Sequence, residues 1–236
     1  AQHDADEFDH VWTAWDDVTG KELKPSMVRT ARSDEMAYVK KMGVYEVRPK
    51  SECWQLTGAP PIRSRWVDIN KGDIVDPNYR SRLVARGIKT EIRPDLFAAT
   101  PLLEAMKLIL SMLASGNKGE KLMVNDVSRA FFCAPARRQV FVELPEEDKD
   151  GRDMIGELNF SMYGTRDAAQ NWEETYVEFM ESLGFQRGRA SPCVFYHSKR
   201  KVRAVIHGDD FTILGMDGAL GWFREHLLGN FEVKCG

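Results

Sequence analysis

Two apolar runs, residues 204–206 and 211–214, flank the tetrapeptide His207-Gly208-Asp209-Asp210, and this stretch constrains the fold more than any other. Both runs are rich in β-branched residues, which favour strands. Gly208 supplies the backbone freedom of a tight turn. The pattern predicts a β-hairpin with two adjacent carboxylates at its tip. Adjacent carboxylates raise each other's pKa unless a cation lies nearby, so a solvated turn and half of a divalent-metal site are the two alternatives.

Length and composition exclude several classes of protein. The chain has 236 residues, 43% of them hydrophobic, which is enough for one substantial core or two smaller ones. No apolar run reaches the length of a transmembrane helix, and the acidic first residues lack the features of a signal peptide. The chain begins with Ala1 rather than Met, which suggests an excised fragment or a processed product. The scattered cysteines form no Cys-x-x-Cys pattern, which favours a reduced intracellular compartment.

The net charge of −3 conceals an uneven distribution. Residues 24–93 hold 15 Lys and Arg against 8 Asp and Glu, whereas residues 1–23 are acidic. A local excess of cations can neutralise nucleic-acid phosphates although the whole chain is acidic. An ordinary solvated surface has the same composition, so the charge alone leaves both interpretations open.

Periodicity and turn signals predict a mixture of helices and strands. Helices are expected where apolar residues recur at helical spacing between capping signals, over 34–43, 101–115, 168–184 and 217–228. Strands are expected where β-branched and aromatic residues alternate or cluster, over 44–47, 62–67, 79–86, 121–126, 139–144, 155–162 and 193–197, on both sides of the hairpin tip and from 231 to 234. Residues 1–31 show weak periodicity and predict a peripheral arm or leader.

Asp126 ends one predicted strand, and Asp209 with Asp210 forms the tip of the hairpin much later in the chain. Both strands are apolar enough to be neighbours in one sheet, which would bring three carboxylates together. Three carboxylates at one point repel one another unless cations bind between them. Two magnesium ions, about 4 Å apart, stabilise the attacking and leaving oxygens of a phosphoryl displacement. The residues themselves therefore indicate nucleotidyl transfer.

Four motifs carry a resemblance to a known family. The segment Arg80-Ser-Arg-Leu-Val-Ala-Arg-Gly87 is similar to Lys-Ala-Arg-Leu-Val-Ala-Arg-Gly of copia-type LTR-retrotransposon reverse transcriptases. Asp126-Val-Ser-Arg-Ala-Phe131 resembles their first catalytic motif, Asp-Val-x-x-Ala-Phe. Tyr163-Gly164 with Trp172 resembles their Tyr-Gly-Leu-Lys-Gln-Ala-Pro-Arg-x-Trp segment, and the hairpin tip stands where they have Tyr-Val-Asp-Asp. The motifs follow the family order over residues 32–236.

The resemblance implies an α+β fold with the fingers and palm of a right-hand polymerase, an antiparallel palm sheet packed on helices, and no thumb. Residues 1–31 would be the arm, 32–100 a fingers-like subdomain, and 101–236 a palm-like subdomain with a fingers insertion. The implied activity is RNA- or DNA-templated DNA synthesis by two-metal transfer to a primer 3′-hydroxyl. Mg²⁺ would be the metal, with Mn²⁺ as a substitute. Template–primer and deoxynucleoside triphosphates would be the partners, in a cytoplasmic particle or the nucleus, with the oligomeric state left open.

The resemblance also implies roles for the residues around the metals. Asp126, Asp209 and Asp210 would be the catalytic carboxylates, with Asp126 and Asp209 as bridging ligands and the main-chain carbonyl of Val127 completing one metal shell. Phe131 would be the steric gate that excludes a ribose 2′-hydroxyl. Core packing is the alternative for one residue of the Phe131-Phe132 pair.

Other implied contacts involve the nucleotide. One or more of Arg80, Arg82 and Arg86 would hold the triphosphate, because guanidinium groups bind phosphate bidentately. A solvent-exposed strand face is the alternative for these arginines. Gly164 would allow the template or base to approach the backbone closely. Lys234 would be a general acid on pyrophosphate.

Departures from the family pattern leave two further functions open. His207 and Gly208 replace the family Tyr-Val, so they would contact the primer from a loosened hairpin, and Asp167 would place a negative charge near the nucleic acid. A catalytically impaired or co-opted nucleic-acid-binding relic is therefore one alternative. An RNA-dependent RNA polymerase is another, because Gly-Asp-Asp is also the hairpin sequence of viral replicases, although Phe131 argues against ribonucleotides.

Overall fold

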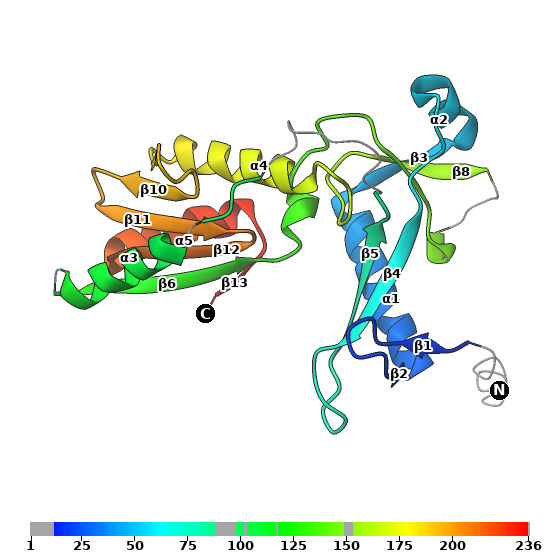
Figure 1. Cartoon of the computed structure of the whole chain (residues 1–236), viewed down its shortest axis with the longest axis horizontal. Coiled ribbons are helices and arrows are strands. Elements are labelled where there is room, and N and C mark those ends of the chain that lie inside the picture. Colours follow the sequence, from blue (N-terminus) through cyan, green and yellow to red (C-terminus); the bar gives the residue numbers. More distant parts are fainter. Residues whose placement is uncertain (1–11, 88–97, 102, 117, 149–152, 236) are drawn as a thin grey trace. The chain divides into compact units, whose positions relative to one another are not determined.

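The computed structural model describes residues 12–87, 98–101, 103–116, 118–148 and 153–235. The chain divides into two compact units, and most of their helices and strands are labelled in Figure 1. The first unit contains residues 1–91 and 136–166, and the second contains residues 92–135 and 167–236.

The first unit consists of short antiparallel sheets and helices. Its elements are β1 (Ala14–Trp15), β2 (Glu22–Leu23), α1 (Pro25–Met42), β3 (Tyr45–Pro49), α2 (Lys50–Thr57), β4 (Ser64–Asn70), β5 (Tyr79–Ala85), β7 (Phe141–Glu143), the 3₁₀ turn η2 (Glu146–Asp148) and β8 (Met154–Leu158). β4 and β5 form a ribbon, one face of which holds Asp68 and Ser81. Arg32 of α1 pairs with Asp68 over 2.6 Å. Helix α1 therefore covers this face of the ribbon, and the alternate residues of β5 project from the other face.

The second unit contains a six-stranded sheet in the order β13-β6-β12-β11-β10-β9, in which every neighbouring pair is antiparallel. Its elements are α3 (Leu103–Ser115), β6 (Glu120–Val127), the 3₁₀ turn η1 (Ala130–Cys133), α4 (Ala168–Ser182), β9 (Gln186–Arg187), β10 (Val194–His197), β11 (Val202–His207), β12 (Asp210–Met216), α5 (Asp217–Asn230) and β13 (Val233–Cys235). The mixture of helices and antiparallel sheets confirms the α+β class.

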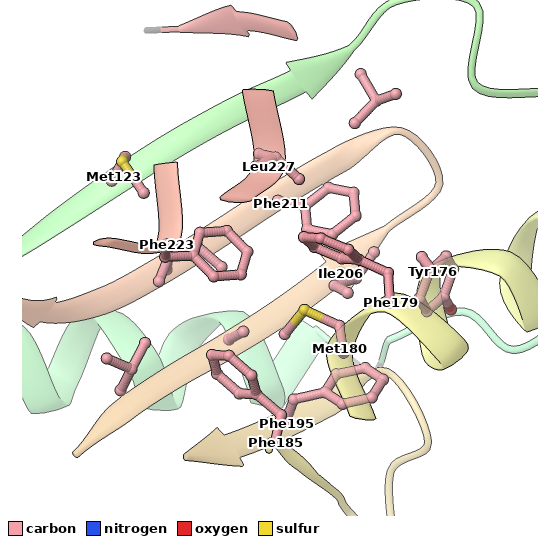
Figure 2. Packing of buried hydrophobic residues seen from close by; sticks show 14 of the residues in the cluster. Met123, Tyr176, Phe179, Met180, Phe185, Phe195, Ile206, Phe211, Phe223 and Leu227 are labelled. Atoms are coloured by element: carbon pink, nitrogen blue, oxygen red, sulfur yellow. The ribbon is translucent and has the colours of Figure 1, made fainter. Parts of the chain in front are cut away.

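Helices pack on both faces of this sheet. On one face a large aromatic core joins the sheet to α4 and α5, and Figure 2 shows Tyr176 and Phe179 of α4 beside Phe211 of β12, with Phe223 of α5 close by. On the other face Ile109 of α3 packs against strand residues of β11 and β12. Successive side chains of a strand alternate between faces, so Asp210, next to Phe211, projects from the α3 face.

Most of the long elements agree with the sequence. The helices predicted over 101–115, 168–184 and 217–228 are confirmed by α3, α4 and α5, and the hairpin around 207–210 is confirmed by β11 and β12. Helix α1 begins at Pro25 rather than residue 34, because proline fits the first turn of a helix. Residues 14–23 form a small hairpin whose Asp16 and Asp17 carboxylates accept main-chain hydrogen bonds from Asn70 and Asp68 of β4.

Candidate active site at the β11–β12 hairpin

A row of four polar residues crosses the strands of the second unit. Asp126 on β6 lies opposite Asp210 on β12 and, on its other side, opposite Lys234 on β13. His207 on β11 also lies opposite Asp210. Directly opposed residues of antiparallel strands project from the same face, so all four belong to one face of the sheet. The predicted adjacency of the two aspartate-bearing strands is confirmed.

Gly208 and Asp209 form the turn between β11 and β12. Gly208 has a φ of 61°, which glycine adopts without strain, and glycine in the first turn position is typical of a type II′ hairpin. The peptide N–H of Val127 donates to the carbonyl of Asp209 over 2.9 Å. The indole N–H of Trp172 donates to the carbonyl of Gly208 over 2.8 Å. Two hydrogen bonds from outside the hairpin therefore hold the turn, and Gly208 fits its backbone conformation. The sequence alone suggests that Gly208 loosens the hairpin.

The ionisation of Asp210 is affected by its surroundings. Partial removal of the carboxyl group from water raises the pKa of Asp210, and the negative charges of Asp209 and Asp126 raise this pKa further. The charge of His207 lowers the same pKa. A bound cation relieves repulsion of this kind, so binding a cation would stabilise the ionised carboxylates.

The donor set suits a hard divalent cation, because Mg²⁺ is held by carboxylate and carbonyl oxygens. Across the part of the chain that the structure describes, however, no three His, Cys, Asp or Glu side chains lie close enough together to hold an ion. The register brings Asp126 and Asp210 to one face. Metal binding therefore requires the side chains to turn toward one another from these backbone positions.

The segment after Asp126 contains a strained residue that the sequence does not reveal. Arg129 has a φ of 50°, a left-handed conformation that is uncommon for residues other than glycine. It precedes η1, in which Phe132 is fully buried and Phe131 is half-buried. Phe132 is therefore the packing member of the pair, and Phe131 keeps an accessible surface. Such strain is concentrated at functional sites.

The predicted triphosphate-binding arginines lie in the first unit. Arg80 and Arg82 are opposite Ile69 and Val67 of β4, so they share the face of the ribbon that points away from α1. The guanidinium of Arg82 lies 4.6 Å from the centre of the Tyr163 ring. Among the described residues the buried Nε of Arg82 has no hydrogen-bond partner. Arg86, just beyond the strand, is exposed.

Gly164, also in the first unit, lies against the end of β5. It has a φ of 82°, and a Cβ at this position would lie 1.9 Å from the carbonyl oxygen of Ala85. The peptide N–H of Ala85 donates to the carbonyl of Tyr163 over 2.7 Å. Packing of the backbone is therefore sufficient to require glycine here.

Asp167 occupies the N-terminal end of α4, and only 5% of its surface is exposed. Its carboxylate is therefore turned into the protein. The sequence predicts a negative charge near the nucleic acid at this position, and in the structure this residue is enclosed at the helix end rather than displayed on the surface.

A protein-family model described as reverse transcriptase (RNA-dependent DNA polymerase) matches residues 51–235. The chain belongs to the reverse transcriptase family. The resemblance to copia-type retrotransposon enzymes is confirmed by curated relatives that cover most of this reverse transcriptase domain.

None of the helices within the described ranges combines the length and apolarity that a membrane crossing needs.

Two relatives illustrate the extent of the similarity. The retrovirus-related Pol polyprotein from transposon TNT 1-94 of Nicotiana tabacum is 27% identical over 217 residues, which cover 86% of this chain and 16% of the relative. The corresponding polyprotein from transposon RE1 of Arabidopsis thaliana is 25% identical over 196 residues, which cover 77% of this chain and 13% of the relative. The reverse transcriptase domain thus spans a small part of the length of these polyproteins.

Proposed function

We propose that this reverse transcriptase domain synthesises DNA on an RNA or DNA template by two-metal transfer of a nucleotide to a primer 3′-hydroxyl. The observation that carries the proposal is the direct opposition of Asp126 and Asp210 on neighbouring strands, with Asp209 in the adjoining turn. The charges of Asp126 and Asp209 both raise the pKa of Asp210, which supports a shared cation site. Family membership supports the same activity.

The metal-binding groups come from β6 and the hairpin. Asp126 and Asp209 would be the bridging ligands, and Asp210 the third carboxylate. The carbonyl of Val127 points to the same side of β6 as its N–H, which donates to Asp209, so this carbonyl faces the hairpin tip and suits a metal ligand. When bound, two Mg²⁺ ions, or Mn²⁺ in their place, would neutralise the triphosphate and lower the pKa of the primer hydroxyl.

Residues beside the aspartates would select and orient the substrates. The half-buried Phe131 would exclude the ribose 2′-hydroxyl. His207 and Gly208, both exposed at the hairpin, would contact the primer end. Lys234, exposed and opposite Asp126, would donate a proton to the pyrophosphate leaving group.

Residues of the first unit would hold the nucleotide and template. Arg80, Arg82 and Arg86 would supply guanidinium groups to the triphosphate. The buried Nε of Arg82 has no hydrogen-bond partner within the described ranges, which supports this residue in particular. Gly164, between Tyr163 and the end of β5, would lie along the template.

We assign the six-stranded sheet with α4 and α5 to the polymerase palm, and residues 32–100 to the fingers, with residues 1–31 as a peripheral arm. Residues 136–166 belong to the same compact unit as residues 1–91. This grouping supports a fingers insertion within the palm sequence.

Primer extension tests the proposal. The purified protein is incubated with template–primer, Mg²⁺ and either deoxynucleotides or ribonucleotides. We expect the wild-type protein to incorporate deoxynucleotides. The rate of incorporation should fall about a hundredfold or more in Asp126→Asn and Asp209→Asn, because charge stabilisation at the reacting phosphate is removed. Equal extension by Asp209→Asn would contradict the proposal.

The same assay separates two other functions. Salt-sensitive binding of template–primer by the wild-type protein without incorporation would indicate a nucleic-acid-binding relic. This second candidate is favoured by His207 and Gly208, which stand where the family has Tyr-Val. Preference for ribonucleotides would indicate an RNA polymerase.

A further inference from the structure

Trp172 connects helix α4 to the tip of the hairpin. Its indole N–H donates to the carbonyl of Gly208 over 2.8 Å, and only 2% of its surface is exposed. Gly208 directly precedes Asp209 in the turn. The bond therefore reaches the backbone of the metal-binding loop from inside the protein.

The ring of Trp172 is held in place by other aromatic side chains. It makes edge-on contacts with Phe211, Tyr176 and Phe231 at centroid distances of 6.4, 5.8 and 5.4 Å. Phe211 is the residue after Asp210, and Phe231 leads into the strand that carries Lys234. These contacts fix the direction of the indole N–H, because edge-on packing on three sides restricts rotation of the ring.

The carbonyls of both turn residues are thus occupied by donors from different elements. Gly208 accepts from Trp172 of α4, and Asp209 accepts from Val127 of β6. Phe211 belongs to the same core as Trp172 and is the neighbour of Asp210 in β12, so the two side chains project from opposite faces of the sheet. Trp172 therefore approaches the hairpin from the core face, and the aspartates of the row project from the opposite face.

We infer that Trp172 is a positioning residue for the reaction, whose indole N–H holds the β11–β12 turn so that Asp209 and Asp210 converge with Asp126 on the metal ions. This inference rests on the proposed function for its catalytic meaning. Its structural part, the restraint of the turn by a side-chain donor, is independent of activity. Packing alone does not explain the contact, since phenylalanine would fill much of the same space without donating to Gly208.

Trp172→Phe removes the donor and keeps an aromatic ring, and Tyr176→Phe is the matched control. Tyr176 lies on the same helix in the same buried core, but its hydroxyl contacts Cys193 rather than the turn. Amide hydrogen exchange is measured for both variants without metal. We expect exchange at residues 207–210 to accelerate about tenfold in Trp172→Phe, corresponding to one lost hydrogen bond. The control is expected to exchange at the wild-type rate there.

The activity of the same proteins tests the catalytic meaning. If the wild type incorporates deoxynucleotides, Trp172→Phe is expected to have about tenfold lower kcat and to need more Mg²⁺ for half-maximal rate, with the KM for deoxynucleotide unchanged. Wild-type kcat and Mg²⁺ dependence in Trp172→Phe would overturn the positioning role. An inactive wild type would refute the proposed function instead. Unchanged amide exchange at residues 207–210 in Trp172→Phe would refute the restraint of the turn, whether or not the wild type is active.

Discussion

The buried amide of Asn125, the residue before Asp126, leads to a prediction about stability. Asn125 is fully buried, and within the described ranges neither its amide oxygen nor its amide nitrogen has a hydrogen-bond partner. It lies opposite Phe211, and the alternate residues Met123 and Val127 belong to the aromatic core. The polar group is therefore enclosed by apolar side chains directly behind the aspartate row.

Replacement by leucine should stabilise the second unit. An unpartnered buried polar group costs about 1–3 kcal/mol, and a buried leucine contributes about 1.5–3 kcal/mol relative to exposure. Leucine is branched differently from asparagine, so overpacking offsets about 1–3 kcal/mol of this gain. We expect Asn125→Leu to raise the free energy of unfolding by about 1–2 kcal/mol, which corresponds to an increase in Tm of about 2–8 °C for a chain of this size.

Urea denaturation followed by circular dichroism measures this change. The midpoint should rise while the slope of free energy against urea concentration stays constant. Val124→Leu is the matched control, because Val124 is the neighbouring residue of β6 with 41% of its surface exposed, and its change should lie within about 0.5 kcal/mol of zero. A loss of more than about 1 kcal/mol in Asn125→Leu would refute the reasoning, since it would mean that the amide is bonded in the folded protein.

Three other predictions concern groups at defined positions. Asp210→Asn should raise the Tm of the metal-free protein at neutral pH, because a raised pKa makes the ionised form unfavourable in the fold. In differential scanning calorimetry this difference should vanish as the pH falls below the ordinary carboxyl value of 3.8, and a lower Tm in the variant at neutral pH would contradict the account. Gly208→Ala should lower the Tm, because φ is 61° and alanine is strained in this conformation. Open space surrounds the new methyl group, so a steric clash does not contribute. Gly218→Ala in α5, where φ is not positive, should raise it in the same measurement, and the same sign for both variants would show that backbone conformation is not the cause. Main-chain hydrogen bonds, led by that from Asn70, lower the pKa of Asp16 to about 2, so its stabilising effect is complete above its ordinary value of 3.8 and is lost as the pH falls through about 2. The Tm advantage of the wild type over Asp16→Asn should therefore shrink on acidification across this range, and an advantage that grows would reverse the sign of the argument.

The sequence predicts those helices and strands whose buried side is marked by a periodic pattern of apolar residues. Helix α4 follows from apolar residues at helical spacing, and the hairpin follows from β-branched runs around Gly208. The adjacency of the strands that carry Asp126 and Asp210 follows because both strands are apolar enough to be neighbours in one sheet, whereas the register that places the two residues opposite each other is seen only in the structure.

Other features depend on tertiary contacts that no local pattern reports. The bond between Trp172 and Gly208 joins residues far apart in the chain, and helical spacing identifies Trp172 merely as a core residue. The left-handed conformation of Arg129 has no signal in its residue type. The burial of Asp167 has no signal in its residue type, because exposure is set by the packing around the start of α4.

The location of bound metal tests the central claim most directly. Crystals of the protein with template–primer, deoxynucleotide and Mn²⁺ would reveal the ions by anomalous scattering. The account predicts two ions about 4 Å apart, with carboxylate oxygens of Asp126 and Asp209 within about 2.5 Å of them. Manganese bound elsewhere, with Asp126 and Asp209 more than about 8 Å apart, would contradict the assignment of this hairpin as the catalytic centre.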